Sequence, residues 1–269
     1  MTRPFRPGEL ALLVDSRGRQ YLVTLEAGAE FHTHTGIVEH DEVLGESEGI
    51  TVRSGTGARY TALRPSLADF VLRMPRDAQV GYPKDIAAIL QLADVHPGVR
   101  VFEAGVGSGA LSIALLRAGA DVVGYERRPE FAERATANVR TFLGDDAMAR
   151  YRVELADAYE GVAGDGFDAV VLDLPEPWRV VAHAERCLRR GGTFVAYTPS
   201  VAQVMHLRES LAASEFELVA TLEVLQRTWH VEGQAVRPDH RMVAHTAFLT
   251  HARLLGPVPG GLKLPRTPG

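Results

Sequence analysis

The sequence contains almost no cysteine and almost no lysine. Its one cysteine among 269 residues is Cys187, which excludes an intrachain disulfide and a cysteine-based zinc cluster and agrees with a reducing compartment. The lysines are Lys84 and Lys263, so nearly all of the 29 basic residues are arginines. Arginine suits bidentate contacts with phosphate groups, although genomic codon bias accounts for such an excess equally well.

Long apolar runs are also missing. No stretch approaches the roughly 18 apolar residues of a membrane helix, and the first residues lack the apolar core of a signal peptide. We therefore expect a cytoplasmic protein without membrane contacts. We also expect no bound metal, because no cysteine or carboxylate cluster accompanies His32 and His34.

The charge balance is slightly acidic and uneven. With 34 acidic residues against 29 basic ones, the formal charge of −5 argues against a protein that coats nucleic acid by bulk electrostatics. From Arg179 onward, however, 11 basic residues outnumber 7 acidic ones. The C-terminal third is therefore the better candidate for contact with an anion.

The pattern of apolar residues changes near residue 65. Residues 1–64 contain short apolar runs separated by turn residues and glycines, which predicts a small β domain. In residues 65–269, strand and helix patterns alternate, which predicts a mostly parallel α/β sheet with helices on both faces and ligands at the carboxyl ends of its strands. The strand patterns lie at 99–103, 122–126, 151–155, 167–172, 193–198, 216–224 and 245–250, and the helix patterns at 83–92, 111–118, 129–143, 180–190 and 201–213.

A glycine loop at a strand-to-helix turn is the strongest local signal. Glycines let the backbone turn tightly and approach a ligand without a Cβ. In the dinucleotide fingerprint the third glycine comes one residue later, and here Glu103 stands two residues before the first glycine. S-adenosylmethionine has no pyrophosphate but carries an ammonium and a sulfonium group, for which Glu103 offers a direct or water-mediated partner. The loop therefore favours S-adenosylmethionine over NAD; it reads Glu103-Ala104-Gly105-Val106-Gly107-Ser108-Gly109-Ala110-Leu111.

Acidic residues close the following strands. Glu126 comes 17 residues after Gly109, near the roughly 20-residue spacing of an acid that accepts both ribose hydroxyls. Asp157 follows the next strand, where it can accept from the adenine amine while the Ala158 amide meets a ring nitrogen. Each acid taken singly also fits a solvated strand end, but all of them in register with the loop favour a cofactor site.

Asp173 ends the fourth strand, in a loop that two prolines stiffen. In this fold the position faces the methyl donor. An aspartate there can accept a proton or hydrogen bond from the N6 amine of adenine, which pushes electron density toward N1 and stabilises the cation formed when N1 is methylated. Asp173 could instead serve as a helix N-cap, and Trp178 could be a packing residue.

These motifs together resemble one family, the tRNA (adenine-58-N1) methyltransferases of the bacterial and archaeal single-subunit type. The resemblance runs from about residue 8 to about residue 255. Many methyltransferases share the glycine loop, but the last three of the following blocks together are specific. Besides the loop, the matching blocks are Phe31-His32-Thr33-His34-Thr35-Gly36 with His40-Asp41, Gln79-Val80-Gly81-Tyr82-Pro83-Lys84-Asp85, Asp173-Leu174-Pro175-Glu176-Pro177-Trp178 and Arg237-Pro238-Asp239-His240-Arg241-Met242-Val243-Ala244-His245-Thr246-Ala247-Phe248-Leu249.

The resemblance implies a class I methyltransferase domain at 65–269 behind the small β domain, a homotetramer, and methyl transfer from S-adenosylmethionine to N1 of adenine 58 in the T-loop of tRNA. It implies that Asp173 is the catalytic aspartate and that Tyr197 lies near the target base. Gln79 and Tyr82 would close over the cofactor. The expected cofactor contacts are Gln79, Tyr82, Glu103, Gly105, Val106, Gly107, Ser108, Gly109, Ala110, Glu126, Arg127, Asp157, Ala158 and Asp173.

Binding of a folded RNA by an acidic chain needs local features. The target base must swing out of its stack, and Tyr197 or Trp178 could then stack on it. Arginine patches combined over several subunits would reconcile tRNA binding with the net charge, and Arg237, Arg241 and Arg253 are candidates for that surface. Two alternatives remain at this point: a methyltransferase that acts on a protein or small molecule, and a non-catalytic RNA-binding subunit.

Overall fold

The computed structural model describes residues 3–75 and 81–255 of the chain. The chain divides into two compact units, Met1–Pro75 and Arg76–Gly269. The expected boundary between residues 64 and 65 falls after the last strand of the first unit, and the short helix α1 that follows still belongs to that unit. No helix in the described ranges combines the length and apolar character needed to cross a membrane.

The first unit is a small antiparallel β domain, as the sequence predicted. Four strands form a sheet in the order β2-β1-β6-β5, and β3 pairs with β4 as a separate hairpin. Phe5, Leu13 and Tyr60 are buried in its core. The capping box of Ser66 and Asp69 starts α1. The elements are β1 Leu10–Asp15, β2 Gln20–Thr24, β3 Glu30–Thr33, β4 Gly36–Glu39, η1 His40–Glu42, β5 Thr51–Arg53, β6 Arg59–Leu63 and α1 Leu67–Arg73.

The second unit is a Rossmann-like sheet with helices on both faces, also as predicted. Seven strands run in the order β12-β15-β11-β10-β7-β8-β9, and β15 is antiparallel to both of its neighbours. The elements up to the fifth sheet strand are α2 Pro83–Leu92, β7 Arg100–Ala104, α3 Ala110–Arg117, β8 Asp121–Glu126, α4 Pro129–Leu143, η2 Asp145–Arg150, β9 Tyr151–Leu155, β10 Phe167–Leu172, η3 Pro177–Val180, α5 Val181–Cys187 and β11 Leu188–Thr198. The remaining elements are α6 Val201–Ala212, β12 Phe216–Glu223, β13 Trp229–Glu232, β14 Ala235–Pro238 and β15 Phe248–Leu254.

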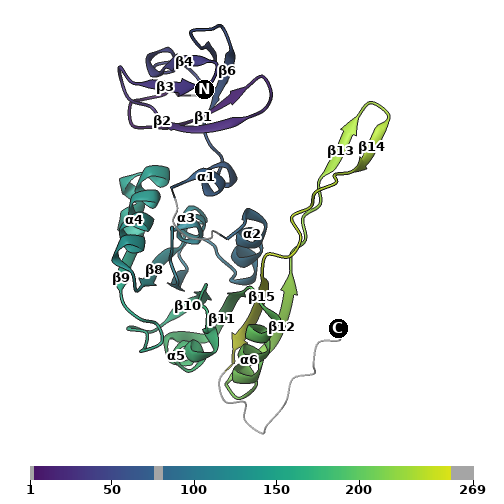
Figure 1. Cartoon of the computed structure of the whole chain (residues 1–269). Helices are drawn as coiled ribbons and strands as arrows, with labels where there is room; N and C mark the ends of the chain where they lie inside the picture. The colour runs from purple at the N-terminus through teal and green to yellow at the C-terminus, as the bar shows by residue number, and fades with distance from the viewer. Residues whose placement is uncertain (1–2, 76–80, 256–269) are drawn as a thin grey trace. The chain divides into compact units, whose positions relative to one another are not determined.

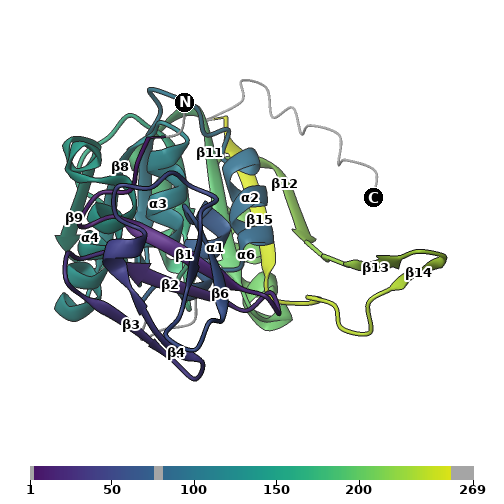
Figure 2. The same cartoon turned by 90° about the horizontal axis from the view of Figure 1, so that it is seen from above.

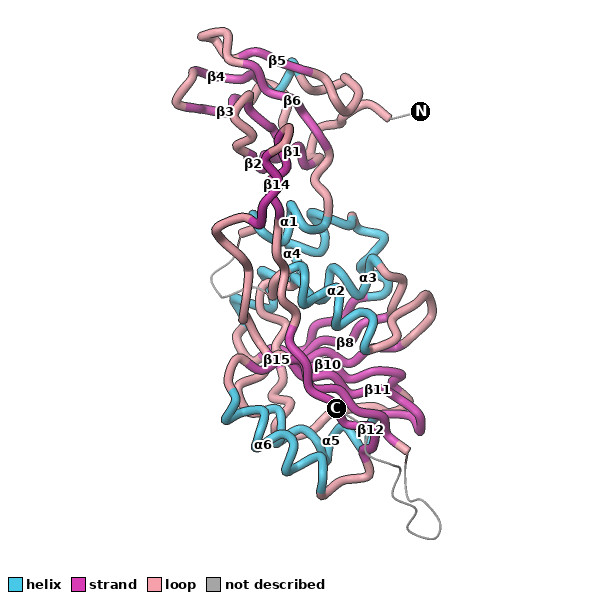
Figure 3. The backbone as a smooth tube through the Cα atoms, turned by 90° about the vertical axis from the view of Figure 1, so that its right-hand side faces the viewer, coloured by secondary structure: helices cyan, strands magenta, loops and turns pink. Residues whose placement is uncertain are grey.

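The helices lie in two layers, one on each side of the sheet. Helices α2, α3 and α4 cover one face and α5 and α6 the other (Figure 3). Apolar residues such as Phe102, Phe167 and Phe194 are buried where sheet and helices meet, and Cys187 packs among them as a small apolar residue. This arrangement brings the carboxyl ends of β7, β8, β10 and β11 to one edge of the sheet.

Several predicted boundaries in this unit are wrong. The helix expected to run to residue 190 ends at Cys187, and the strand expected from residue 193 begins at Leu188, because Leu188 pairs with Phe167 in the sheet, where its side chain is buried. The strand expected at 245–250 begins at Phe248 and extends to Leu254, because His245 and Thr246 are engaged by side-chain hydrogen bonds before the ladder begins.

A long excursion between β12 and β15, residues 224–247, forms what we call the arm. It carries the β13–β14 hairpin, which the sequence analysis did not predict, and it extends away from the sheet (Figures 1 and 2). Near its base, Gln226 and Val243 form an isolated bridge. In the hairpin Trp229 pairs with Pro238 and Val231 with Val236, so these side chains share one face of the ribbon. Trp229, Val231 and Val236 are 57%, 68% and 60% exposed, so this face is apolar and uncovered in the single chain.

Candidate active site

A pocket lies at the carboxyl edge of the sheet, where the glycine loop meets the end of β10. The start of α2 forms one wall and the start of α3 another. Of the predicted residues, the structure brings Asp173 and Tyr197 to the lining together with most of the loop. The lining residues are Gly81, Ile86, Ile89, Gly105, Val106, Gly107, Ser108, Ala110, Leu111, Asp173 and Tyr197.

Gly105 is required by the close approach of the loop to β10. Its φ of +84° is a left-handed conformation, and a Cβ added there would come 2.0 Å from the carbonyl oxygen of Asp173. The Asp173 amide in turn donates to the Ala104 carbonyl at 2.9 Å. Backbone contacts of this kind fix the position of Asp173 relative to the loop.

Asp173 presents its side chain to the pocket. Asp173 is accessible to solvent through the pocket, but many protein atoms lie close around its carboxyl group. This desolvation, followed by the nearby Glu126 carboxylate, raises the pKa of Asp173 to about 7. At neutral pH, Asp173 is therefore poised between its acidic and its basic form.

Glu103 lies behind the loop and is buried. Its carboxylate accepts a hydrogen bond from the Ser112 hydroxyl at 2.6 Å, and Ser112 accepts one from the Tyr151 hydroxyl at 3.1 Å. Burial, with added repulsion from Asp173 and Glu126, raises the pKa of Glu103 to about 8. Glu103 is absent from the lining found among the described residues, so its contact with a cofactor stays a prediction.

The ends of β8 and β9 hold the next predicted residues. Glu126 accepts hydrogen bonds from the backbone amides of Gly107, at 3.0 Å, and Arg127, at 2.9 Å. The Arg127 side chain pairs with Asp157 at 3.1 Å, and Ala158 is buried beside them. These residues adjoin the loop, but their predicted contacts with ribose and adenine stay predictions.

Two predicted aromatic residues lie on elements that line the pocket, α2 and β11. Tyr82 is the N-cap residue of α2 and is 37% exposed, whereas Tyr197 is 9% exposed at the end of β11. Gln79 lies outside the described residues. Val106 packs on β8: a Cβ at Gly124 would lie 2.6 Å from its Cγ2.

The sequence analysis did not predict that three residues at this edge of the sheet would form a cluster. Lys84, Asp85 and Thr246 form a closed hydrogen-bonded cluster beside the pocket. All three occur in the family blocks, and Lys84 is one of two lysines in the chain. That rarity is the signal that could have pointed to it.

The electrostatics of the site suit a positively charged ligand. Glu103, Glu126 and Asp173 stand at neighbouring strand ends, and Asp173 and Glu126 each raise the pKa of Glu103. Because the carboxylates repel one another, a cation in the pocket would relieve that repulsion. The sulfonium and ammonium groups of S-adenosylmethionine fit this set, and left-handed Gly107 leaves room for it, since an added Cβ would meet nothing closer than 3.9 Å.

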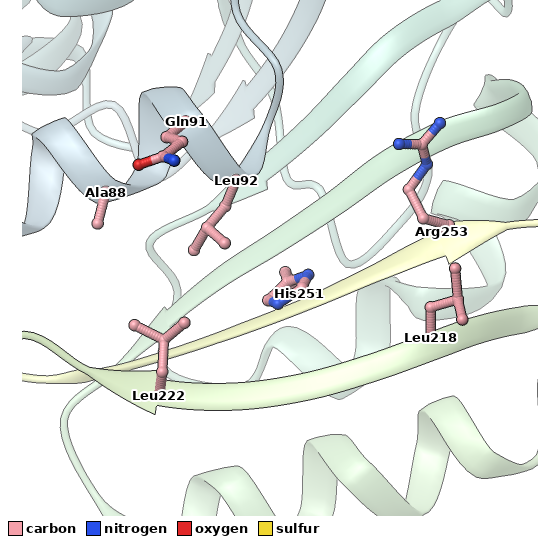
Figure 4. Close-up of a pocket in the computed structure, with 7 residues that line it drawn as sticks. All are labelled: Ala88, Gln91, Leu92, Leu218, Leu222, His251 and Arg253. Carbon is pink, nitrogen blue, oxygen red and sulfur yellow. The ribbon is translucent and has the colours of Figure 1, made fainter. Parts of the chain in front are cut away.

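A second hollow lies under α2 against β12 and β15, away from the loop (Figure 4). It is lined by Ala88, Gln91, Leu92, Leu218, Leu222, His251 and Arg253. Arg253 pairs with Thr193, five residues before the end of β11, so it lies toward the amino ends of the parallel strands, away from Asp173. Arg237 is on the arm hairpin and Arg241 follows it, and both are exposed. The structure therefore does not bring these arginines together on one surface of the single chain.

Comparisons with known proteins identify the family of this chain. Residues 61–239 match the family model described as tRNA methyltransferase complex GCD14 subunit, and residues 4–52 match the one described as TrmI-like N-terminal. The tRNA (adenine(58)-N(1))-methyltransferase TrmI of Thermus thermophilus is 40% identical over 250 residues, 92% of this chain and 97% of that protein. The chain belongs to the tRNA (adenine-58-N1) methyltransferase family. It is a class I, S-adenosylmethionine-dependent enzyme.

Two solved structures have the same fold as this chain. The tRNA (m1A58) methyltransferase TrmI of Aquifex aeolicus has a TM-score of 0.82 at 28% identity and covers 94% of this chain and 100% of that one. A Thermotoga maritima structure titled as an S-adenosylmethionine-dependent O-methyltransferase has a TM-score of 0.90 at 33% identity, with 95% and 96% covered. Family membership thus includes the small β domain as well as the seven-stranded sheet.

Proposed function

We propose that this enzyme methylates N1 of adenine 58 in tRNA, in the cytoplasm, with Asp173 as the catalytic residue. The observation that carries this proposal is the position of Asp173. Its side chain opens into the pocket, while its backbone is fixed to the glycine loop through the Ala104 carbonyl and the close approach of Gly105. An acceptor held this rigidly next to the cofactor loop suits a base that gains positive charge during the reaction.

In the proposed mechanism the chain binds and polarises the base. S-adenosylmethionine, when bound, supplies the electrophilic methyl group. The Asp173 carboxylate accepts a hydrogen bond from the N6 amine, which raises the electron density at N1, and it stabilises the positive charge that the base gains as N1 is methylated. Tyr197 offers its ring for stacking against the flipped base.

The test is transfer of labelled methyl to tRNA transcripts, followed by nucleoside digestion. Wild-type enzyme should yield 1-methyladenosine from the natural transcript and none when adenine 58 is replaced by guanine. S-adenosylmethionine binding without transfer to any tRNA would overturn the proposal and favour a protein or small-molecule substrate.

A second test isolates Asp173. Asp173→Asn should keep S-adenosylmethionine affinity and lower kcat by about 100-fold or more, the scale of a lost acid–base group. Glu176→Gln changes another carboxylate of the same loop, one that pairs with Arg179 at 3.0 Å, and should retain nearly full turnover. Equal losses of binding and turnover in Asp173→Asn would contradict its catalytic role.

We also propose that the enzyme is a homotetramer whose contacts include the apolar face of the arm hairpin. Trp229, Val231 and Val236 are exposed together on one face of a ribbon, and contiguous exposed apolar side chains are typical of interaction surfaces. In light scattering, Val236→Asp should shift the protein to a smaller assembly, whereas Ala235→Asp, on the opposite face, should not. A tetramer that both variants leave intact would exclude the hairpin from the interface.

A further inference from the structure

Both ends of the arm are held by a single side chain. The Lys84 ammonium donates to the Val224 carbonyl, at 2.6 Å, where the chain leaves β12, and to the Thr246 hydroxyl, also at 2.6 Å, where the chain returns to β15. Lys84 itself lies in the first turn of α2, the helix that walls the cofactor pocket. One cation therefore connects three segments that are distant in the sequence.

The cluster around this cation is closed and buried. Lys84 also donates to Asp85 at 2.7 Å, and the Thr246 hydroxyl donates to the other Asp85 oxygen at 2.6 Å. The side chains of Lys84 and Asp85 are 4% and 0% exposed. A buried ion pair is tolerated when each proton and acceptor finds a partner, and here all three ammonium protons do. Such a cluster resists small displacements, because losing one contact leaves a buried charge partly unpaired.

The choice of lysine agrees with this geometry. Lysine is very rare in this chain, and almost every other cation is arginine. A compact ammonium can direct three protons to a carboxylate, a carbonyl and a hydroxyl that converge on one point, whereas a planar guanidinium cannot. The position therefore requires lysine for its shape as well as its charge.

The cluster borders the part of the pocket where the base is expected. Ile86 and Ile89, on the same helix as Lys84, line the pocket. No hydrogen bond reaches the buried Tyr197 hydroxyl from the described part of the chain, although Thr246 lies close to it, and the Asp85 and Asp173 charges both act on it. Tyr197 thus lies next to both the cluster and the catalytic aspartate.

We propose that Lys84, Asp85 and Thr246 act as a positioning cluster that couples the base of the arm to the pocket, keeping Tyr197 and the α2 wall aligned for methyl transfer. This inference rests on the proposed roles of Asp173 and Tyr197. It predicts that disturbing the cluster slows the chemical step more than it weakens cofactor binding. It also predicts that a change in the arm reaches the pocket through Lys84.

The test uses two threonine variants of equal size. Thr246→Val removes the hydroxyl of the cluster, and Thr250→Val removes another threonine hydroxyl, which pairs with Thr221 at 2.9 Å within the same sheet edge. At a temperature well below both melting transitions, Thr246→Val should lower kcat by about tenfold while the S-adenosylmethionine KM stays within about twofold, a scale expected for small misplacements of reacting groups. Thr250→Val should leave kcat unchanged, even where it lowers the melting temperature.

A double-mutant cycle with Tyr197→Leu, which removes the aromatic ring and keeps an apolar side chain, tests the route of the effect. If the cluster acts by positioning the Tyr197 ring, the kcat losses of Thr246→Val and Tyr197→Leu should be non-additive. Wild-type kcat in Thr246→Val, or fully additive losses, would overturn the inference. Failure of the proposed function would look different, because wild-type enzyme would then not methylate adenine 58 at all.

Discussion

The glycine loop and the arm differ in how far along the chain their supporting contacts come. The loop is held by contacts of shorter range: Glu103 bonds to Ser112, 9 residues away, Gly107 to Glu126, 19 residues away, and Ala104 to Asp173, further along the same α/β unit. The arm is held at its base by contacts from Lys84 that span 140 and 162 residues. The loop is therefore supported by the strands next to it, whereas the arm depends on the completed sheet.

The largest effect should come from disrupting the glycine loop. Gly105→Ala forces a Cβ onto the Asp173 backbone at a left-handed φ, and we expect it to abolish S-adenosylmethionine binding and to reduce methylation by about 100-fold or more. Gly81→Ala is the matched control, since Gly81 lines the same pocket and its added Cβ would lie an ordinary 3.6 Å from Ile86. Isothermal titration and a methylation assay measure both. Cofactor binding by Gly105→Ala at wild-type affinity would refute the close-packing argument.

A change in the arm hairpin should lower tRNA methylation without weakening cofactor binding. In Val236→Asp we expect the S-adenosylmethionine Kd to stay within about twofold and tRNA methylation to fall by about tenfold, because the changed hairpin lies outside the pocket but in the proposed interface. Ala235→Asp should behave as wild type in both assays. An equal loss of cofactor affinity in Val236→Asp would mean that the arm and the loop are not separable.

The pH dependence of turnover tests the raised pKa of Asp173, which lies against the glycine loop. With a pKa of about 7, Asp173 loses its carboxylate form as the pH falls, so kcat/KM should fall about tenfold per pH unit below pH 7. Bound S-adenosylmethionine is positively charged and favours the carboxylate form of Asp173. The acidic limb of the kcat profile should therefore lie at lower pH than that of the kcat/KM profile. Stopped assays between pH 5 and pH 9, with buffers overlapped, measure both profiles. A kcat/KM that is flat from pH 5 to pH 7 would contradict the raised pKa.

The smallest effect concerns stability. The folded state raises the pKa of Glu103 from 4.5 to about 8, so it binds a proton there that the unfolded chain releases. This contribution to stability is complete below pH 4.5 and is lost as the pH rises toward 8. Glu103→Gln should therefore flatten the decline of the unfolding free energy over that range, measured by urea denaturation. Asp173 also has a raised pKa, so measuring Asp173→Asn alongside gives its share of the slope of unfolding free energy against pH. If Glu103→Gln leaves that slope unchanged, Glu103 is not a buried, protonated carboxyl.

The sequence was sufficient for those features that local spacing controls. The glycine loop, the acids at the strand ends and Asp173 were all predicted, because each follows a strand whose apolar pattern is strong. The arm hairpin was missed because Trp229, Val231 and Val236 pack against no core of their own chain, so their pattern is too short and exposed to predict strands. The joint role of Lys84 and Thr246 was missed because no spacing rule connects residues so far apart.

The burial of Lys84 also affects how amine reagents act on the protein. Within residues 3–75 and 81–255 it carries the sole ε-amino group, with 4% of its side chain exposed and all three protons bonded. Acylating reagents, lysine-directed crosslinkers and lysine-specific proteases thus find no accessible target there while the base of the arm stays closed. Labelling of Lys84 would therefore report the opening of this one joint, and its rate would measure how often the arm separates from the helix beneath it.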